Sequence, residues 1–152
     1  MPINDPEEGA RPAEILLVED DPEDVRRTRE ALTIGKLHNN LHTVGDGIEA
    51  LEFLHRRGKY TNAVRPDVIL LDLNLPRKDG REVLAEIKTN DELKRIPVVV
   101  ITTSKEEEDV VRSYRMHANC YITKPIDVEK FVSVVQAIDN FWLTIVTLPS
   151  AE

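Results

Sequence analysis

Acidic residues, a threonine and a lysine follow four short apolar runs of the chain, and together these residue types could bind and transfer phosphate. Glu19 and Asp20 follow the first run, Asp72 a later one, and Thr102 and Lys124 the last two. Crowded carboxylates repel one another unless a cation joins them, and hard oxygen ligands favour Mg²⁺ or Mn²⁺. Because a magnesium site of this kind usually leaves positions for phosphate oxygens, we expect phosphoryl chemistry here.

Asp72 is the expected nucleophile. It follows four aliphatic residues in the segment 68–76, VILLDLNLP, and a charge at the end of a buried strand is costly unless something requires it. A carboxylate in this position can attack phosphorus to form an aspartyl phosphate. Lys124 and a cation would stabilise the equatorial oxygens, and the Thr102 hydroxyl would donate to one of them. A capped turn would explain Asp72 alone, but its companions at other strand ends favour the nucleophile.

The framework that must position these residues is predicted from the hydrophobic pattern. Apolar runs predict strands at 15–18, 41–44, 67–71, 97–102 and 120–123. Apolar residues spaced three or four apart predict helices at 22–35, 47–58, 80–90, 105–117 and from 127 onward. Three of the strands are apolar throughout, as in parallel strands covered on both faces. The alternation predicts an α/β fold with a doubly wound five-stranded parallel sheet and five helices.

Boundary residues support these elements and the location of the site. Asp21 and Pro22 predict a capped helix start, and Gly35 and Gly58 lie where helices would end. In an open parallel sheet, ligands bind outside the carboxyl ends of the strands. We therefore expect the polar residues that follow the strands to meet at one edge of the sheet.

Composition narrows the class of protein. The formal net charge of −8 over 152 residues argues against binding to nucleic acid or to an anionic membrane. Cys120 is the single cysteine, which excludes an intramolecular disulfide and suits a reducing compartment. No apolar run is long enough to span a bilayer, and the first residues do not resemble a signal peptide, so we expect a cytoplasmic protein. We expect a disordered tail at 1–13, a globular domain at 14–140 and an apolar extension at 141–152.

Four motifs in this order resemble the receiver domains of two-component response regulators: ILLVEDD, VILLDLNLPRKDG, IPVVVITTS and CYITKP. The resemblance covers nearly all of the expected globular domain. It implies the flavodoxin-like receiver fold with strand order 2-1-3-4-5. It also implies that a histidine kinase donates the phosphoryl group, and that the protein is a signalling switch rather than a conventional enzyme.

The resemblance also assigns roles to the site residues. Asp72 resembles the phosphoacceptor, Asp20 the direct metal ligand and Glu19 its acidic companion. The backbone carbonyl of Asn74 would complete the protein ligands of Mg²⁺, with Mn²⁺ as the alternative. Lys124 would bind the phosphate and precede a cis peptide bond to Pro125.

Two further residues resemble the family's switch. Thr102 would move toward the phosphate, and Tyr121 would turn inward and remodel the surface around the fourth helix, the fifth strand and the fifth helix. Half-buried packing explains Tyr121 equally well. Thr103 is larger than the small residue usual at its position, which bears on access to the phosphate and on its lifetime. Asp21 is a third acid, but capping the first helix is its expected role.

The end of the chain predicts a narrower relationship. Residues 141–149, FWLTIVTLP, contain the single Trp and no charge, and few residues follow the fifth expected helix, so we expect no output domain. This pattern resembles single-domain regulators that serve phytochrome-type histidine kinases and dimerise through a C-terminal extension. A contiguous apolar strip covers its own domain or a second subunit, and we favour a two-fold homodimer that also uses the fourth-to-fifth-helix face.

Three rival functions share part of this pattern. A phosphatase of the haloacid dehalogenase class also uses an aspartate at a strand end, but it needs a second acid where this chain has Asn74. A receiver-like interaction module that is never phosphorylated is the second rival, and the sequence argues against it because every chemical part is present. A flavodoxin-like flavin binder shares the fold, yet acids stand where a hydroxyl-rich phosphate loop would follow the first strand.

Overall fold

The computed structural model describes residues 12–34, 38–102, 120–124, 127, 129, 130 and 133. A parallel five-stranded sheet has the order β2-β1-β3-β4-β5, which confirms the predicted fold. Its strands are β1 (Ala13–Val18), β2 (Asn39–Val44), β3 (Val68–Asp72), β4 (Val98–Thr102) and β5 (Cys120–Thr123). The helices are α2 (Pro22–Ile34), α3 (Gly47–His55) and α4 (Gly80–Thr89), with a short 3₁₀ turn, η1 (Gly58–Tyr60).

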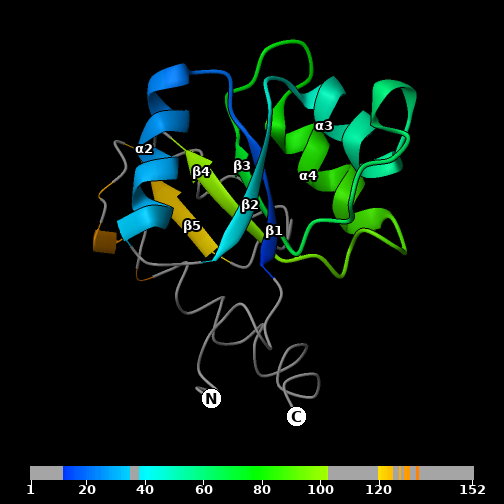
Figure 1. Cartoon of the computed structure of the whole chain (residues 1–152). Helices are drawn as coiled ribbons and strands as arrows, with labels where there is room; N and C mark the ends of the chain where they lie inside the picture. Colours follow the sequence, from blue (N-terminus) through cyan, green and yellow to red (C-terminus); the bar gives the residue numbers. More distant parts are fainter. Residues whose placement is uncertain are drawn as a thin grey trace, which may run out of the picture.

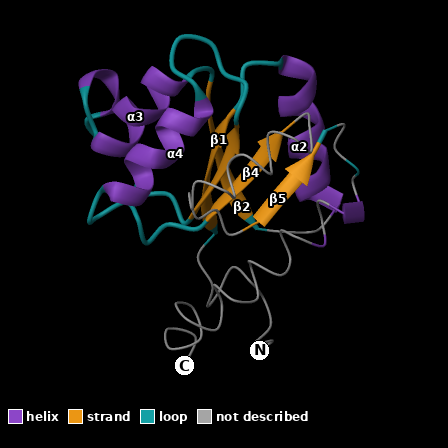
Figure 2. Cartoon of the chain, turned by 180° about the vertical axis from the view of Figure 1, so that it is seen from behind, coloured by secondary structure: helices purple, strands orange, loops and turns teal. Residues whose placement is uncertain are grey.

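Helices cover both faces of the sheet, α2 on one face and α3 with α4 on the other (Figures 1 and 2). Successive residues of β1 therefore enter different cores. Leu16 and Val18 pack in the core shared with α3 and α4, whereas Ile15 and Leu17 pack in the core shared with α2. This burial on both faces explains why the last four residues of β1 are all apolar, whereas β2, at the edge of the sheet, keeps several polar residues.

The helix starts follow their capping residues. Asp21 accepts a hydrogen bond from the backbone N–H of Glu23 at 2.9 Å, so it caps α2 as predicted. Asp79 and Glu82 form a capping box at the start of α4. These caps place both helix N-termini beside the carboxyl end of the sheet.

One predicted helix end is wrong. The helix expected at 47–58 ends at His55, where Arg56 adopts a left-handed conformation with φ of 56°. Gly58 is therefore not its C-cap but begins η1, with φ of 57°. The chain can leave the helix early because the N–H of Arg57 still satisfies the carbonyl of Glu52 at 2.9 Å.

Several predictions fall largely outside the described residues. These are the tail at 1–13 except its last two residues, Gly35, Thr103, the helix at 105–117, Pro125 and the extension at 141–152. Of the helix expected from 127, residues 129, 130 and 133 are described and helical. Asp127 accepts hydrogen bonds from the N–H groups of Glu129 and Lys130, as a helix-capping residue does.

Candidate functional site

Three carboxylates converge where β1 and β3 end, as the sequence predicted. Glu19 and Asp20 directly follow β1, and Asp72 is the last residue of β3. The two strands are neighbours, so one ligand oxygen from each of the three residues lies within 4.8 Å of the others. Glu19 and Asp72 are only 4% and 1% exposed, whereas Asp20 is exposed to solvent. Two of the acids are therefore buried and the third lies at the mouth of the site.

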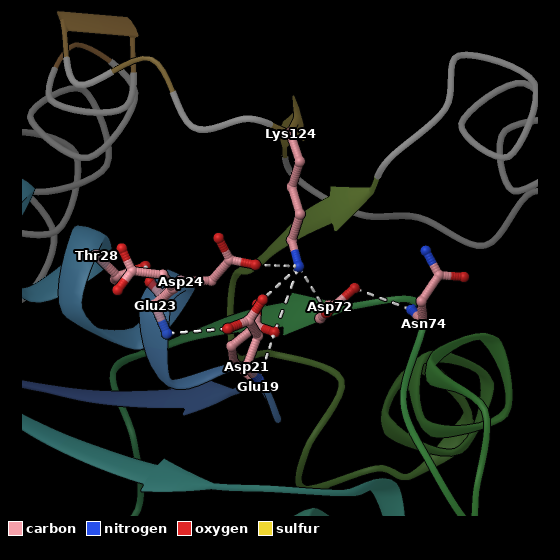
Figure 3. Close-up of polar contacts among 8 residues, drawn as sticks. All are labelled: Glu19, Asp21, Glu23, Asp24, Thr28, Asp72, Asn74 and Lys124. Atoms are coloured by element: carbon pink, nitrogen blue, oxygen red, sulfur yellow. Dashed lines mark hydrogen bonds and ion pairs between the residues drawn. The ribbon is translucent and has the colours of Figure 1, made fainter.

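Lys124, at the end of β5, places its positively charged ammonium group among these carboxylates (Figure 3). Its backbone N–H donates to the carbonyl of Thr102 at 2.7 Å, which ties the residue to the end of β4. Its Nζ lies 2.9 Å from Oδ2 of Asp72 and 3.1 Å from Oε1 of Glu19. Lys124 therefore binds the predicted nucleophile and its acidic neighbour at once.

Asp24 is a fourth carboxylate of the site, and the sequence analysis missed it. It lies in the first turn of α2, and its Oδ2 is 2.8 Å from Nζ of Lys124. The signal was available, because Asp21 and Pro22 start the helix immediately after β1. A first-turn acid must then lie near the carboxyl end of the sheet, where it also suits the helix dipole.

The proximity of these charges shifts their protonation. Burial, followed by the negative charge of Asp72, raises the pKa of Glu19 from 4.5 to about 7. Burial opposes the charge on Lys124, but its hydrogen bonds to Asp24 and Asp72 outweigh that effect and raise its pKa. Lys124 therefore remains a cation at neutral pH, while Glu19 titrates near neutrality in the cation-free site.

The observed donor set fits a divalent cation. Oε1 of Glu19 is buried and accepts no hydrogen bond from the described residues, although the Lys124 ammonium is close enough for an ion pair. One ammonium thus faces three carboxylates, from Glu19, Asp24 and Asp72, and leaves this negative charge only partly balanced. The carboxylates of Glu19 and Asp72, which are buried, and of Asp20, which is exposed, offer oxygen ligands that Mg²⁺ and Mn²⁺ accept.

The remaining predicted residues border this cluster. The backbone N–H of Asn74 donates to Oδ1 of Asp72 at 2.9 Å, so the segment after β3 turns back on the nucleophile. Thr102 ends β4 and is fully buried. Tyr121 in β5 is half-buried and packs against the core shared with α3 and α4. The sheet therefore brings every predicted site residue to its carboxyl edge or the adjoining core.

The parallel sheet and this site define a class of signalling protein. The chain matches the family of response regulator receiver domains over residues 15–136. It therefore belongs to that family, and it is a receiver-domain response regulator of two-component signalling. This family match supports neither a flavodoxin-like flavin binder nor a phosphatase of the haloacid dehalogenase class.

Particular relatives narrow the relationship. The chain is 52% identical to response regulator Rcp1 of Synechocystis over 95% of its length and 99% of that protein. It is 38% identical to the probable methanogenesis regulatory protein FilR2 of Methanothrix harundinacea, over 90% of this chain and 87% of the relative.

Solved structures show the same relationship. A phosphorylated cyanobacterial phytochrome response regulator, RcpA, is 51% identical, with a TM-score of 0.75 over 90% of this chain and 98% of that one. The bacteriophytochrome response regulator RtBRR is 38% identical, with a TM-score of 0.81 over 93% and 89%. The Mn²⁺-bound form of Rcp1 is 53% identical, with a TM-score of 0.74 over 90% and 98%. The predicted resemblance to phytochrome-associated regulators is confirmed.

Proposed function

We propose that Asp72 accepts a phosphoryl group from a phosphohistidine of a histidine kinase. The bond between phosphorus and the histidine nitrogen breaks as a bond forms to a carboxylate oxygen of Asp72, and the imidazole leaves. The observation that carries this proposal is the contact of one ammonium, on Lys124, with both Asp72 and Glu19. Lys124 can stabilise negative charge on the transferring group while its ammonium orients Asp72 for attack.

Glu19, Asp20, Asp72 and the backbone carbonyl of Asn74 would hold a divalent cation, which we propose to be Mg²⁺. When bound, it supplies positive charge against the phosphoryl oxygens. The chain's own residues contribute position. Asp72 is fixed by the N–H of Asn74 on one oxygen and by Lys124 on the other. The nucleophile is therefore oriented before any donor arrives.

The signal would leave the site through Thr102 and Tyr121. Both lie on the strands farthest from β2, and Thr102 is joined to Lys124 through the backbone. We propose that phosphorylation draws the Thr102 hydroxyl toward the phosphoryl group and that Tyr121 changes its packing in response. This is a shift between two arrangements of one fold, so the protein acts as a switch or relay rather than as an enzyme with an external substrate.

The proposed donor is a phytochrome-type histidine kinase. The names of RcpA and RtBRR support this choice, because both are described as phytochrome or bacteriophytochrome response regulators.

We also propose a cytoplasmic protein, with residues 14–140 as the receiver unit after a tail at 1–13. Among the helices that the structure describes, none is both long and apolar enough to cross a membrane.

We further propose a homodimer formed by the apolar extension at 141–152 with the fourth-to-fifth-helix face. Deleting residues 142–152 should then convert a dimer to a monomer in sedimentation experiments. An unchanged mass after deletion would contradict this role of the extension.

The direct test of the site is incubation of the full chain with acetyl phosphate and Mg²⁺, followed by mass spectrometry. We expect one phosphoryl adduct that Asp72→Asn abolishes. Asp91→Asn is the matched control, because its side chain is 95% exposed and lies on the loop before β4. If the wild-type adduct persists in Asp72→Asn, the nucleophile is misassigned.

A further inference from the structure

The segment between β3 and α4 contains a strained turn at Arg77. Arg77 has φ of 64°, which side-chain-bearing residues rarely adopt. The backbone N–H of Lys78 donates to the carbonyl of Pro76 at 2.7 Å, across the single residue between them. A three-residue turn of this kind with positive φ is a rare γ-turn, and it persists only where its surroundings hold it.

The side chain of Arg77 supplies one such restraint. Its Nε donates to Oδ2 of Asp46 at 2.9 Å, and its Nη2 lies 2.8 Å from the same oxygen. Asp46 is itself fixed, because its Oδ1 accepts the N–H of Glu49 at 2.8 Å as the N-cap of α3. Arg77 is therefore anchored to a carboxylate that is itself held by the first turn of α3.

The backbone of the turn also packs against α3. A Cβ at Gly47, the first residue of α3, would lie 2.3 Å from the carbonyl oxygen of Lys78. This contact exists only because residue 47 has no side chain. The γ-turn is thus held by α3 in two ways, through its backbone and through the pair of Arg77 with Asp46.

The turn lies three residues after Asn74, the proposed carbonyl ligand of the cation. Upstream, the N–H of Asn74 is bound by Asp72. Downstream, the N–H of Gly80 donates to the carbonyl of Leu73 at 3.1 Å and closes the loop. The path of residues 74–76 is therefore determined by these contacts and by the turn at Arg77.

We propose that the pair of Arg77 with Asp46 is a positioning device that holds the γ-turn and, through it, the Asn74 carbonyl for the divalent cation. Arg77 does not contact the acidic cluster in this role. The inference rests on the proposed function, because it requires the cation site, and it assigns a role to a residue outside that site.

The test is the affinity of the full-length chain for Mn²⁺, measured from the electron paramagnetic resonance signal of the free ion. Arg77→Ala should bind Mn²⁺ about fivefold more weakly, which corresponds to about 1 kcal/mol. This direction is informative, because loss of a positive charge near the site would by itself tighten cation binding. If Arg77 contributed only to stability, Arg77→Ala would lower the free energy of unfolding but leave the Mn²⁺ affinity of the folded protein unchanged.

Arg26→Ala is the matched control. Arg26 is 55% exposed, against 57% for Arg77, and also pairs with carboxylates, those of Glu23 and Glu30 on α2. We expect its removal to leave Mn²⁺ affinity unchanged or slightly higher. Arg77→Gly, which adopts positive φ without strain, should recover part of the affinity lost in Arg77→Ala.

A double-mutant cycle with Asp46→Asn tests the pairing itself, since Asn is an equally good N-cap. If the two residues act as a unit, the double variant should bind Mn²⁺ no more weakly than the weaker single variant. Additive losses, or an Arg77→Ala affinity equal to or tighter than that of the wild type, would overturn the inference. Absence of Mn²⁺ binding by the wild type would instead refute the proposed cation site.

Discussion

Gly80→Ala should destabilise the protein by crowding the strand end that carries Asp72. A Cβ at Gly80 would lie 2.4 Å from the backbone oxygen of Asp72 and 2.5 Å from Cα of Leu73. Both atoms belong to the backbone of a buried segment, so no flexible side chain can move aside. Real Cβ contacts essentially never fall below 3.0 Å, so α4 and the end of β3 must separate by roughly 0.6 Å or more.

The magnitude follows from two opposing effects. Overpacking of this kind costs about 1 to 3 kcal/mol, and replacing Gly by Ala returns up to about 1 kcal/mol by restricting the unfolded chain. We therefore expect the free energy of unfolding to fall by about 1 to 2 kcal/mol, which for a chain of this size lowers Tm by about 3 to 6 °C. Because Asp72 is displaced, phosphorylation by acetyl phosphate should also be slower.

Urea unfolding followed by circular dichroism measures the change, with Gly45→Ala as the matched control. Gly45 lies in the loop between β2 and α3, and nothing lies within 4 Å of a Cβ built there. Gly45→Ala should be neutral or slightly stabilising. If Gly80→Ala unfolds at the same urea concentration as wild type and Gly45→Ala, the close approach of α4 to β3 does not require glycine at residue 80.

Three further predictions concern charge and capping. In cation-free protein, the pKa of Glu19 is about 7 instead of its ordinary 4.5. The contribution of Glu19 to the free energy of unfolding is therefore fully present below pH 4.5 and is lost as the pH rises through about 7. Urea unfolding in EDTA should therefore show that the free energy of unfolding of wild type falls by about 2 kcal/mol relative to Glu19→Gln between about pH 5.5 and 8. If the free energies of the two proteins change with pH in parallel, Glu19 is not buried in its protonated form. Lys124→Met leaves the carboxylates of Glu19, Asp24 and Asp72 without their ammonium, so calorimetry should show tighter Mg²⁺ binding. The cation-free form should unfold about 3 kcal/mol more easily, and unchanged Mg²⁺ affinity would show that Lys124 does not compete with the cation. Asp79→Ala removes the capping box of α4 and should cost about 1 kcal/mol in urea unfolding, whereas no loss would mean that solvent caps the helix equally well.

The sequence by itself determined the fold class and most of the site. The first four residues of β3 are all aliphatic because both faces of the strand are buried, and this pattern can be recognised in the sequence alone. Parallel strands share one carboxyl edge, so the polar residues that follow them had to meet there. Asp72, Glu19 and Lys124 could therefore be grouped from the sequence.

Only the tertiary structure decided which groups make contact and how the intervening loop is held. The sequence shows two acids in the first turn of α2, but only the packing of the helix decides that Asp24 binds Lys124 while Glu23 pairs with Arg26. Likewise, Arg77 adopts positive φ through contacts with Asp46 and with the backbone beside Gly47, which lie some thirty residues away in sequence. Long-range packing overrides local backbone preference at such positions, so the sequence predicted the chemistry of the site but not the contacts that hold it in place.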